Sequence, residues 1–163
     1  MRLCISEGIE EICDSAFIDN GEIYSVTFPS SLEYIGVKAF AFVPIYVIYF
    51  KDNIECIDTD AFANYDDNVR GRRVYVDSQV PPFADESAFD YWHYRADSKS
   101  LLKKYYTLYV PIGSSGNYKN TSPWGYIQEI HEVDLSGIED VPDEVGANVD
   151  GLRVEVRNGE VSF

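Results

Sequence analysis

Short runs of alternating apolar residues recur along the first half of the chain. Leu3–Ile5, Val26–Phe28 and Ile48–Phe50 each place two apolar side chains two residues apart. Because side chains of an extended chain alternate between its two faces, each run predicts a short strand with one apolar face. A second pattern, apolar-x-x-apolar-x-x-x-Ala-Phe, follows each run and predicts an extended piece leading into a helical turn.

The second pattern occurs three times without gaps, so the whole unit repeats. It starts at Ile9, Leu32 and Ile54, at intervals of 23 and 22 residues. A unit of this size cannot bury its apolar face alone, whereas stacked units share one continuous core. The sequence therefore predicts a repeat solenoid in which the inward strand residues and the Phe of each unit form the interior.

The most complete unit runs from Ile23 to Phe40 and reads I-x-x-V-x-F-P-S-S-L-x-x-I-G-x-x-A-F. It resembles the BspA-like branch of leucine-rich-repeat proteins, which is common among bacterial surface proteins. The resemblance implies a right-handed solenoid with a parallel sheet of short strands and short helical or irregular turns. It also implies a secreted or cell-surface location and adhesion as the class of activity.

The units continue with variation after the first three. Residues 73–76 and 107–111 predict two more strands, and an insertion enlarges the unit between them. Beyond them, Tyr118, Trp124 and Ile127 are suited to cover the apolar end of the solenoid. We predict a solenoid of about five units over residues 1–133, the last one capping.

The composition of the chain changes after the predicted solenoid. Residues 134–150 are acidic and contain a proline, which predicts a linker. Residues 151–163 alternate around Asn158-Gly159, a strong hairpin signal. We interpret this last part as a β-hairpin tail that resembles the opening of a carboxy-terminal β-module of secreted Bacteroidetes proteins.

The charge of the chain excludes some classes of partner. Its formal net charge of -15 repels nucleic acid and anionic membranes, and no apolar stretch is long enough to span a bilayer. The repeats begin within a unit at Leu3, with no preceding cap. An open end exposes apolar surface, so either the natural protein extends upstream or end-to-end self-association covers the edge.

Catalytic chemistry has little support. The chain has two histidines, His93 and His131, and none of the familiar nucleophile, zinc or phosphate-loop motifs. Its three cysteines lack metal-ligand spacing, and we interpret them as small buried hydrophobic residues. We therefore expect no enzyme activity, cofactor or metal site.

Two columns of residues form the candidate binding site. If the apolar strand residues point inward, the residues between them stack outward on the exposed sheet face. The first column is Cys4, Thr27, Tyr49, Tyr75 and Tyr109, and the second is Tyr24, Tyr46, Arg72 and Tyr106. Exposed Tyr and Arg are favoured at recognition surfaces, although tyrosines also stack as a structural ladder.

The insertion contains further candidates. Trp92 and Tyr94 lie in the aromatic run of residues 89–95, where a break in a repeat commonly forms a loop. Phe89 occupies the Phe position of its unit and is expected in the core. These residues favour binding of a protein on a host or microbial surface; a carbohydrate-binding module and a structural spacer for a larger surface protein are the alternatives.

Overall fold

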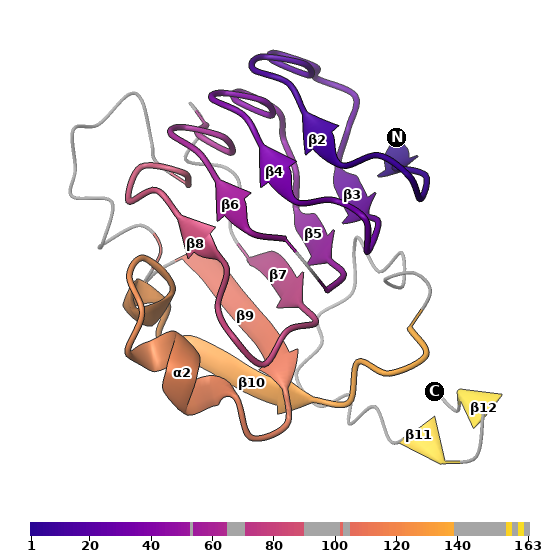
Figure 1. Cartoon of the computed structure of the whole chain (residues 1–163), viewed down its shortest axis with the longest axis vertical. Helices are drawn as coiled ribbons and strands as arrows, with labels where there is room; N and C mark the ends of the chain where they lie inside the picture. The colour runs from indigo at the N-terminus through magenta and orange to yellow at the C-terminus, as the bar shows by residue number, and fades with distance from the viewer. Residues whose placement is uncertain are drawn as a thin grey trace.

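The computed structural model describes residues 1–52, 54–64, 71–89, 102 and 105–138, and the backbone of residues 156–157 and 160–161. Within these residues the chain winds into a solenoid with two parallel sheets (Figure 1). Each of the first four coils contributes one strand to each sheet, β9 (Tyr106–Pro111) and β10 (Glu129–Val133) extend the long sheet alone, and consecutive coils stack side by side. The predicted repeat solenoid is confirmed.

The long sheet contains six strands. In spatial order they are β1 (Arg2–Cys4), β3 (Ser25–Phe28), β5 (Val47–Phe50), β7 (Arg72–Val76), β9 (Tyr106–Pro111) and β10 (Glu129–Val133). All neighbouring strands in it run parallel, so Val26 pairs with Ile48 and Ile48 with Val74. These apolar positions face the interior and are at most 1% exposed, as the alternation predicts.

The short sheet comes from the apolar-x-x-apolar pattern of each unit. Its four strands are β2 (Glu11–Ile12), β4 (Tyr34–Ile35), β6 (Cys56–Ile57) and β8 (Phe83–Ala84), in this order. Ile12, Ile35, Ile57 and Ala84 pair in register and are buried. The fourth strand shows that the enlarged unit keeps the geometry of the regular ones.

The turns after the short strands repeat one backbone conformation. Ser15, Lys38 and Asp60 occupy the same position in three coils and have φ of 57°, 57° and 56°. Between the second and third coils, Phe40 N–H donates to the carbonyl of Ala61 at 2.7 Å, whereas Ala39 N–H donates to a carbonyl of its own turn. Alternate amides therefore join neighbouring coils, which satisfies the turn backbone without a regular helix.

The Ala-Phe positions form the centre of the core. Phe17, Phe40, Phe62 and Phe89 stack face to face, with ring centroids 4.8, 5.4 and 5.4 Å apart. Alanine precedes each Phe because the turn packs closely against its neighbour. Phe89 is 3% exposed, which confirms its predicted place in the core.

Helix α2 (Ser115–Lys119) and the 3-10 helix η1 (Trp124–Tyr126) pack beside the last coil (Figure 1). Tyr118, Trp124 and Ile127 are at most 3% exposed. The Trp124 ring lies 5.6 Å from Phe89 and its Nε1 donates a 2.8 Å hydrogen bond to the carbonyl of Pro82. The predicted covering role of these three side chains is confirmed.

Two features differ from or add to the sequence interpretation. Cys4 and Cys13 are exposed and Cys56 is half-buried, so the interpretation of the cysteines as buried is wrong. Cys4 and Cys56 lie at outward positions of their strands, and Cys13 directly follows β2. β11 (Val156–Arg157) and β12 (Glu160–Val161) pair antiparallel. The boundaries at residues 134 and 151 stay predictions.

Candidate functional site

The first predicted column exists in the register of the long sheet. Cys4 pairs with Thr27, Thr27 with Tyr49, Tyr49 with Tyr75, and Tyr75 with Tyr109. One further residue extends this column, because His131 of β10 pairs with Tyr109. The column therefore crosses the whole outer face of the long sheet.

Only part of the first column is exposed, which corrects the expectation for Thr27 and Tyr49. Thr27 is 5% exposed and Tyr49 only 1%. Ile138 packs against Val47 and Tyr49, and the Tyr49 hydroxyl lies 3.3 Å from the Ile138 carbonyl, to which it donates. The beginning of the predicted linker thus folds back over β5, and this covers Tyr49.

The second predicted column is in register but does not form an exposed surface. Arg72 pairs with Tyr106, yet the two residues are only 4% and 6% exposed, and Tyr106 belongs to the core. They lie two positions before Val74 and Leu108, so alternation turns them to the same inward face. The other two members, Tyr24 and Tyr46, precede their strands and are half-buried.

Arg72 and Tyr106 form a buried pair instead. Nη1 of Arg72 donates a 2.6 Å hydrogen bond to the Tyr106 hydroxyl, and the guanidinium carbon lies 5.4 Å from the centre of the Tyr106 ring. The bond and the cation–π contact both offset the cost of burying the charge. This arrangement assigns Arg72 a structural role at the start of β7.

The part of the column over β7, β9 and β10 forms what we call the aromatic surface. Tyr75 and Tyr109 are half-buried and His131 is exposed. The Tyr75 and Tyr109 rings stack at 4.5 Å and 11°, and the Tyr109 and His131 rings at 5.3 Å and 24°. Each ring of this stack therefore has an aromatic neighbour on the adjacent strand.

Polar residues form a parallel row beside the aromatic rings. Arg73, Thr107 and Glu129 pair across the same three strands, two positions before the aromatic residues. Thr107 Oγ1 donates a 3.2 Å hydrogen bond to Glu129. We include these three residues in the aromatic surface, because a ligand on the rings would contact them too.

The hydroxyl groups of the surface are neutral over the physiological range. Burial raises the pKa of Tyr75, while the charge of Arg73 opposes this effect. Burial also raises the pKa of Tyr109, again opposed by Arg73. Both hydroxyls therefore remain protonated and available as hydrogen-bond donors to a ligand.

The sequence interpretation missed His131 and the polar row. His131 lies in the sixth strand of the long sheet, which has no repeat signature to align it. The sequence did hold a signal for the polar row, because Arg73, Thr107 and Glu129 each lie two residues before an aromatic residue of the column. The two candidates of the insertion, Trp92 and Tyr94, lie outside the described residues.

Residues of the types that can carry chemistry lie on different sheets or are already paired. Cys56 lies in the short sheet and His131 in the long sheet, where its ring stacks on Tyr109. Asp58 accepts a 2.6 Å hydrogen bond from the Tyr34 hydroxyl, which explains its position without a ligand. In the described part of the chain, no three His, Cys, Asp or Glu side chains gather as a metal site would require.

Comparison with known families agrees with this geometry. The family described as "BspA type Leucine rich repeat region" matches residues 2–68 with six copies. Residues 2–68 are a BspA-type leucine-rich-repeat region. No curated protein matches the chain.

The BspA-type match covers the regular coils, and the structure extends the same architecture beyond it. β7, β8 and β9 continue both sheets in parallel register after residue 68, so the enlarged unit and the last coil belong to the same solenoid. The aromatic surface lies on these later coils. Of the helices in the described ranges, none is long and apolar enough to cross a membrane.

Proposed function

We propose that this BspA-type repeat chain is a non-enzymatic binding protein of a bacterial surface or of the secreted fraction. Its aromatic surface binds another protein, and the class of activity is adhesion. The observation that carries the proposal is the stack of Tyr75, Tyr109 and His131 across three adjacent strands. Rigid aromatic side chains give contact area at a low entropic cost, which favours them at protein interfaces.

The stacking geometry favours a protein over a sugar at this surface. A sugar ring stacks on a free aromatic face, but Tyr109 has Tyr75 on one neighbouring strand and His131 on the other. Neighbouring rings therefore occupy its faces and leave its edge and hydroxyl outward. Ring edges and hydroxyls suit the mixed apolar and hydrogen-bonded contacts of a protein interface.

Binding to defined probes tests the proposal. The full chain is applied to immobilised host extracellular-matrix proteins and bacterial surface proteins, and in parallel to a glycan array. For any protein bound, Tyr109→Ala should weaken the affinity about tenfold or more, as expected for an aromatic anchor. Tyr109→Phe should retain most of the affinity because the ring remains.

Tyr34→Ala provides a matched control. Tyr34 is also half-buried but lies in β4 of the short sheet. Equal losses in Tyr34→Ala and Tyr109→Ala would contradict the proposal, because they would report general destabilisation. Saturable glycan binding that Tyr109→Ala abolishes would favour the carbohydrate alternative, and silence across both panels would favour the spacer.

A further inference from the structure

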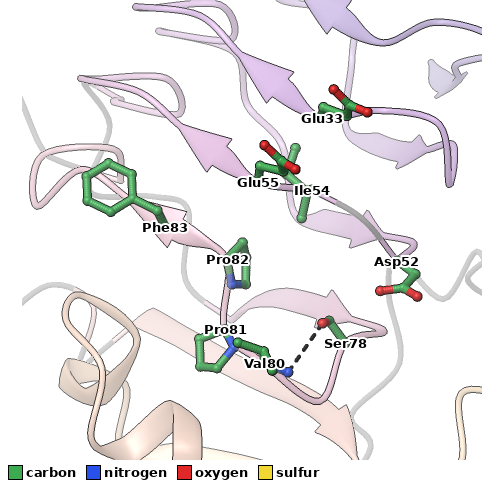
Figure 2. A pocket seen from close by; sticks show the side chains of 9 residues that line it. All are labelled: Glu33, Asp52, Ile54, Glu55, Ser78, Val80, Pro81, Pro82 and Phe83. Carbon is green, nitrogen blue, oxygen red and sulfur yellow. Dashed lines mark hydrogen bonds between the residues drawn. The ribbon is translucent and has the colours of Figure 1, made fainter.

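A second surface lies at the corner between the two sheets, away from the aromatic surface. A hollow of about 510 Å³ lies where the chain passes from β5 to β6 and from β7 to β8. Figure 2 shows the side chains that line it. Val80, Pro81 and Phe83 line one side. Glu33, Asp52 and Glu55 line the other. We call this hollow the corner groove.

The apolar side of the corner groove is unusually exposed. Val80 is 70% exposed and Phe83 is 64% exposed, although neighbouring positions of the same coil are buried. Phe83 is the outward residue of β8, whereas Ala84 faces the core. Exposed apolar side chains at a concave site are typical of a binding surface.

Hydrogen bonds from the cap fix this apolar side. Trp124 Nε1 donates to the carbonyl of Pro82 at 2.8 Å, and the Tyr118 hydroxyl donates to that of Ser78 at 2.8 Å. Asn117 Nδ2 donates to the carbonyl of Gln79 at 3.0 Å. The exposed side chains therefore stand on a fixed backbone, which lowers the entropic cost of binding.

The acidic side repeats with the coils. Glu33 and Glu55 hold the same position in successive units, and Glu55 N–H donates to the Glu33 carbonyl at 2.9 Å. Neighbouring parallel strands lie about 4.8 Å apart, so Glu33 and Glu55 place two negative charges on adjacent coils. Both side chains are exposed, and none of the described residues that line the groove is Lys or Arg. A cationic ligand complements these charges.

We propose that the corner groove binds an extended peptide segment of another protein that carries basic side chains beside an apolar one. The basic groups pair with Glu33, Asp52 and Glu55, while the apolar side chain packs on Val80 and Phe83. The two sides of the groove thus select for two properties of one ligand. This site is independent of the aromatic surface and of the adhesion proposed there.

A labelled peptide tests the groove directly. The probe is a fluorescein-labelled hexapeptide of alternating lysine and leucine, and its anisotropy is followed on titration with the full chain. At 0.15 M salt the Debye length is about 8 Å, so distant carboxylates are largely screened. Glu33→Gln, Asp52→Asn and Glu55→Gln together should weaken binding about tenfold, at roughly 0.5 kcal/mol for each pair.

Two further variants separate the groove from the overall charge. Glu11→Gln, Asp19→Asn and Glu22→Gln remove the same charge outside the groove and outside the aromatic surface, and should change the affinity less than about twofold. Val80→Ser with Phe83→Ala should weaken binding about fivefold or more, because it removes the apolar contact. The unfolding midpoints should hardly change, since all these side chains are exposed.

The outcomes decide the proposal. Equal weakening by the two triple variants would overturn it, because attraction to the net charge would then explain binding. Unchanged affinity of the Val80 and Phe83 variant would overturn it as well, since the apolar side would have no role. If hexalysine bound the parent chain as tightly as the mixed peptide does, the proposal would also be overturned, because the apolar side would have no role. Weakening confined to the groove variants and the mixed peptide supports the proposal.

Discussion

Phe40 stacks on Phe62 with 5.4 Å between the ring centroids and 5° between the ring planes. Each ring belongs to a different coil, and Phe40 N–H donates to the carbonyl of Ala61 beside it. Side-chain stacking and backbone bonding thus join the same two coils at the same place. Because Phe17 and Phe89 continue the stack, the solenoid is stabilised along its axis by contacts between nearest neighbours.

Phe40→Ala should destabilise the chain by about 3–5 kcal/mol, as expected for removing a buried aromatic ring from a packed core. Phe40 is 1% exposed and contacts the rings of Phe17, Phe28 and Phe62. Urea unfolding followed by circular dichroism measures the change. Phe83→Ala is the matched control, because Phe83 is 64% exposed and should cost less than about 0.5 kcal/mol. Similar losses in both variants would contradict the nearest-neighbour description.

The hydrogen bond between Tyr34 and Asp58 should make stability depend on pH in acid. This bond holds the pKa of the Asp58 carboxyl below its usual value, helped by the Thr59 backbone. The folded carboxyl binds a proton less readily than the unfolded one, so its stabilising contribution is complete above the unfolded pKa. It is lost as the pH falls through the folded pKa.

Tyr34→Phe removes the main cause of that shift. The variant should lose about 0.5–1.5 kcal/mol at neutral pH, the typical net value of one hydrogen bond. Its stability should also fall less steeply below pH 4 than that of the parent. Unfolding midpoints at a series of acidic pH values provide the comparison. An acid dependence as steep as the parent's would show that this bond does not set the Asp58 pKa.

Buried tyrosines should destabilise the chain in strong alkali. Burial raises the pKa of Tyr49 to about 12, with Asp77 adding to the effect, and it also raises the pKa of Tyr118. A raised folded pKa contributes stability below the unfolded value near 10, and that contribution is lost as the pH rises toward 12. Tyrosinate absorbance and unfolding measured together from pH 9 to 12 should show these groups ionising late. Tyr49→Phe should reduce the alkaline loss, and an unchanged profile would count against burial of the hydroxyl.

The amino-terminal coil should associate with other copies of the chain. β1 and β2 are edge strands of the two sheets, and Ile9 and Ile18 of the same coil are 43% and 40% exposed. Sedimentation velocity should show a mass that rises with concentration. Ile9→Lys with Ile18→Lys should shift the chain toward monomer, because charges on an edge oppose pairing. Lysines at Val80 and Ile112 serve as the control, and an equal shift there would point to general loss of apolar surface.

The sequence predicted the periodic part of the fold because each coil repeats the same packing problem. Val26, Ile48 and Val74 recur in phase, so the strand faces, the register of Tyr75 with Tyr109, and the interior place of each Phe followed from alignment alone. The inward direction of Arg72 could also have been predicted from the sequence, since Arg72 lies two residues before the inward Val74. That error came from treating a register column as proof of an outward face.

Contacts that do not repeat were beyond the sequence. The contact of Ile138 with Tyr49 joins positions 89 residues apart, and no period connects them. The corner groove likewise combines the acidic column of regular coils with Val80 and Phe83 of the enlarged one. Only half of it had a signal, the recurrence of Glu33 and Glu55 one unit apart. Its apolar half depends on how the cap holds Pro82, which is a tertiary contact.

Gly36 and Gly116 should respond oppositely to the same substitution. A β-carbon at Gly36 would lie 2.4 Å from Oδ1 of Asp14 and 2.7 Å from its backbone nitrogen, whereas one at Gly116 would meet nothing within 4 Å. The side chain of Asp14 is held there, because Val37 N–H donates to its Oδ1 at 2.8 Å. Gly36→Ala should therefore separate two coils and cost about 1–3 kcal/mol.

Gly116 lies within helix α2, where alanine is the better residue. Gly116→Ala should raise stability by about 0.4–1 kcal/mol, because it restricts the unfolded chain without a clash. Urea unfolding of the two variants measures both changes under one condition. Destabilisation by Gly36→Ala accompanied by stabilisation from Gly116→Ala would show that close approach of the coils, rather than glycine content, limits this fold. If Gly36→Ala were neutral, the coils would have to be less tightly spaced at Asp14 than the structure places them.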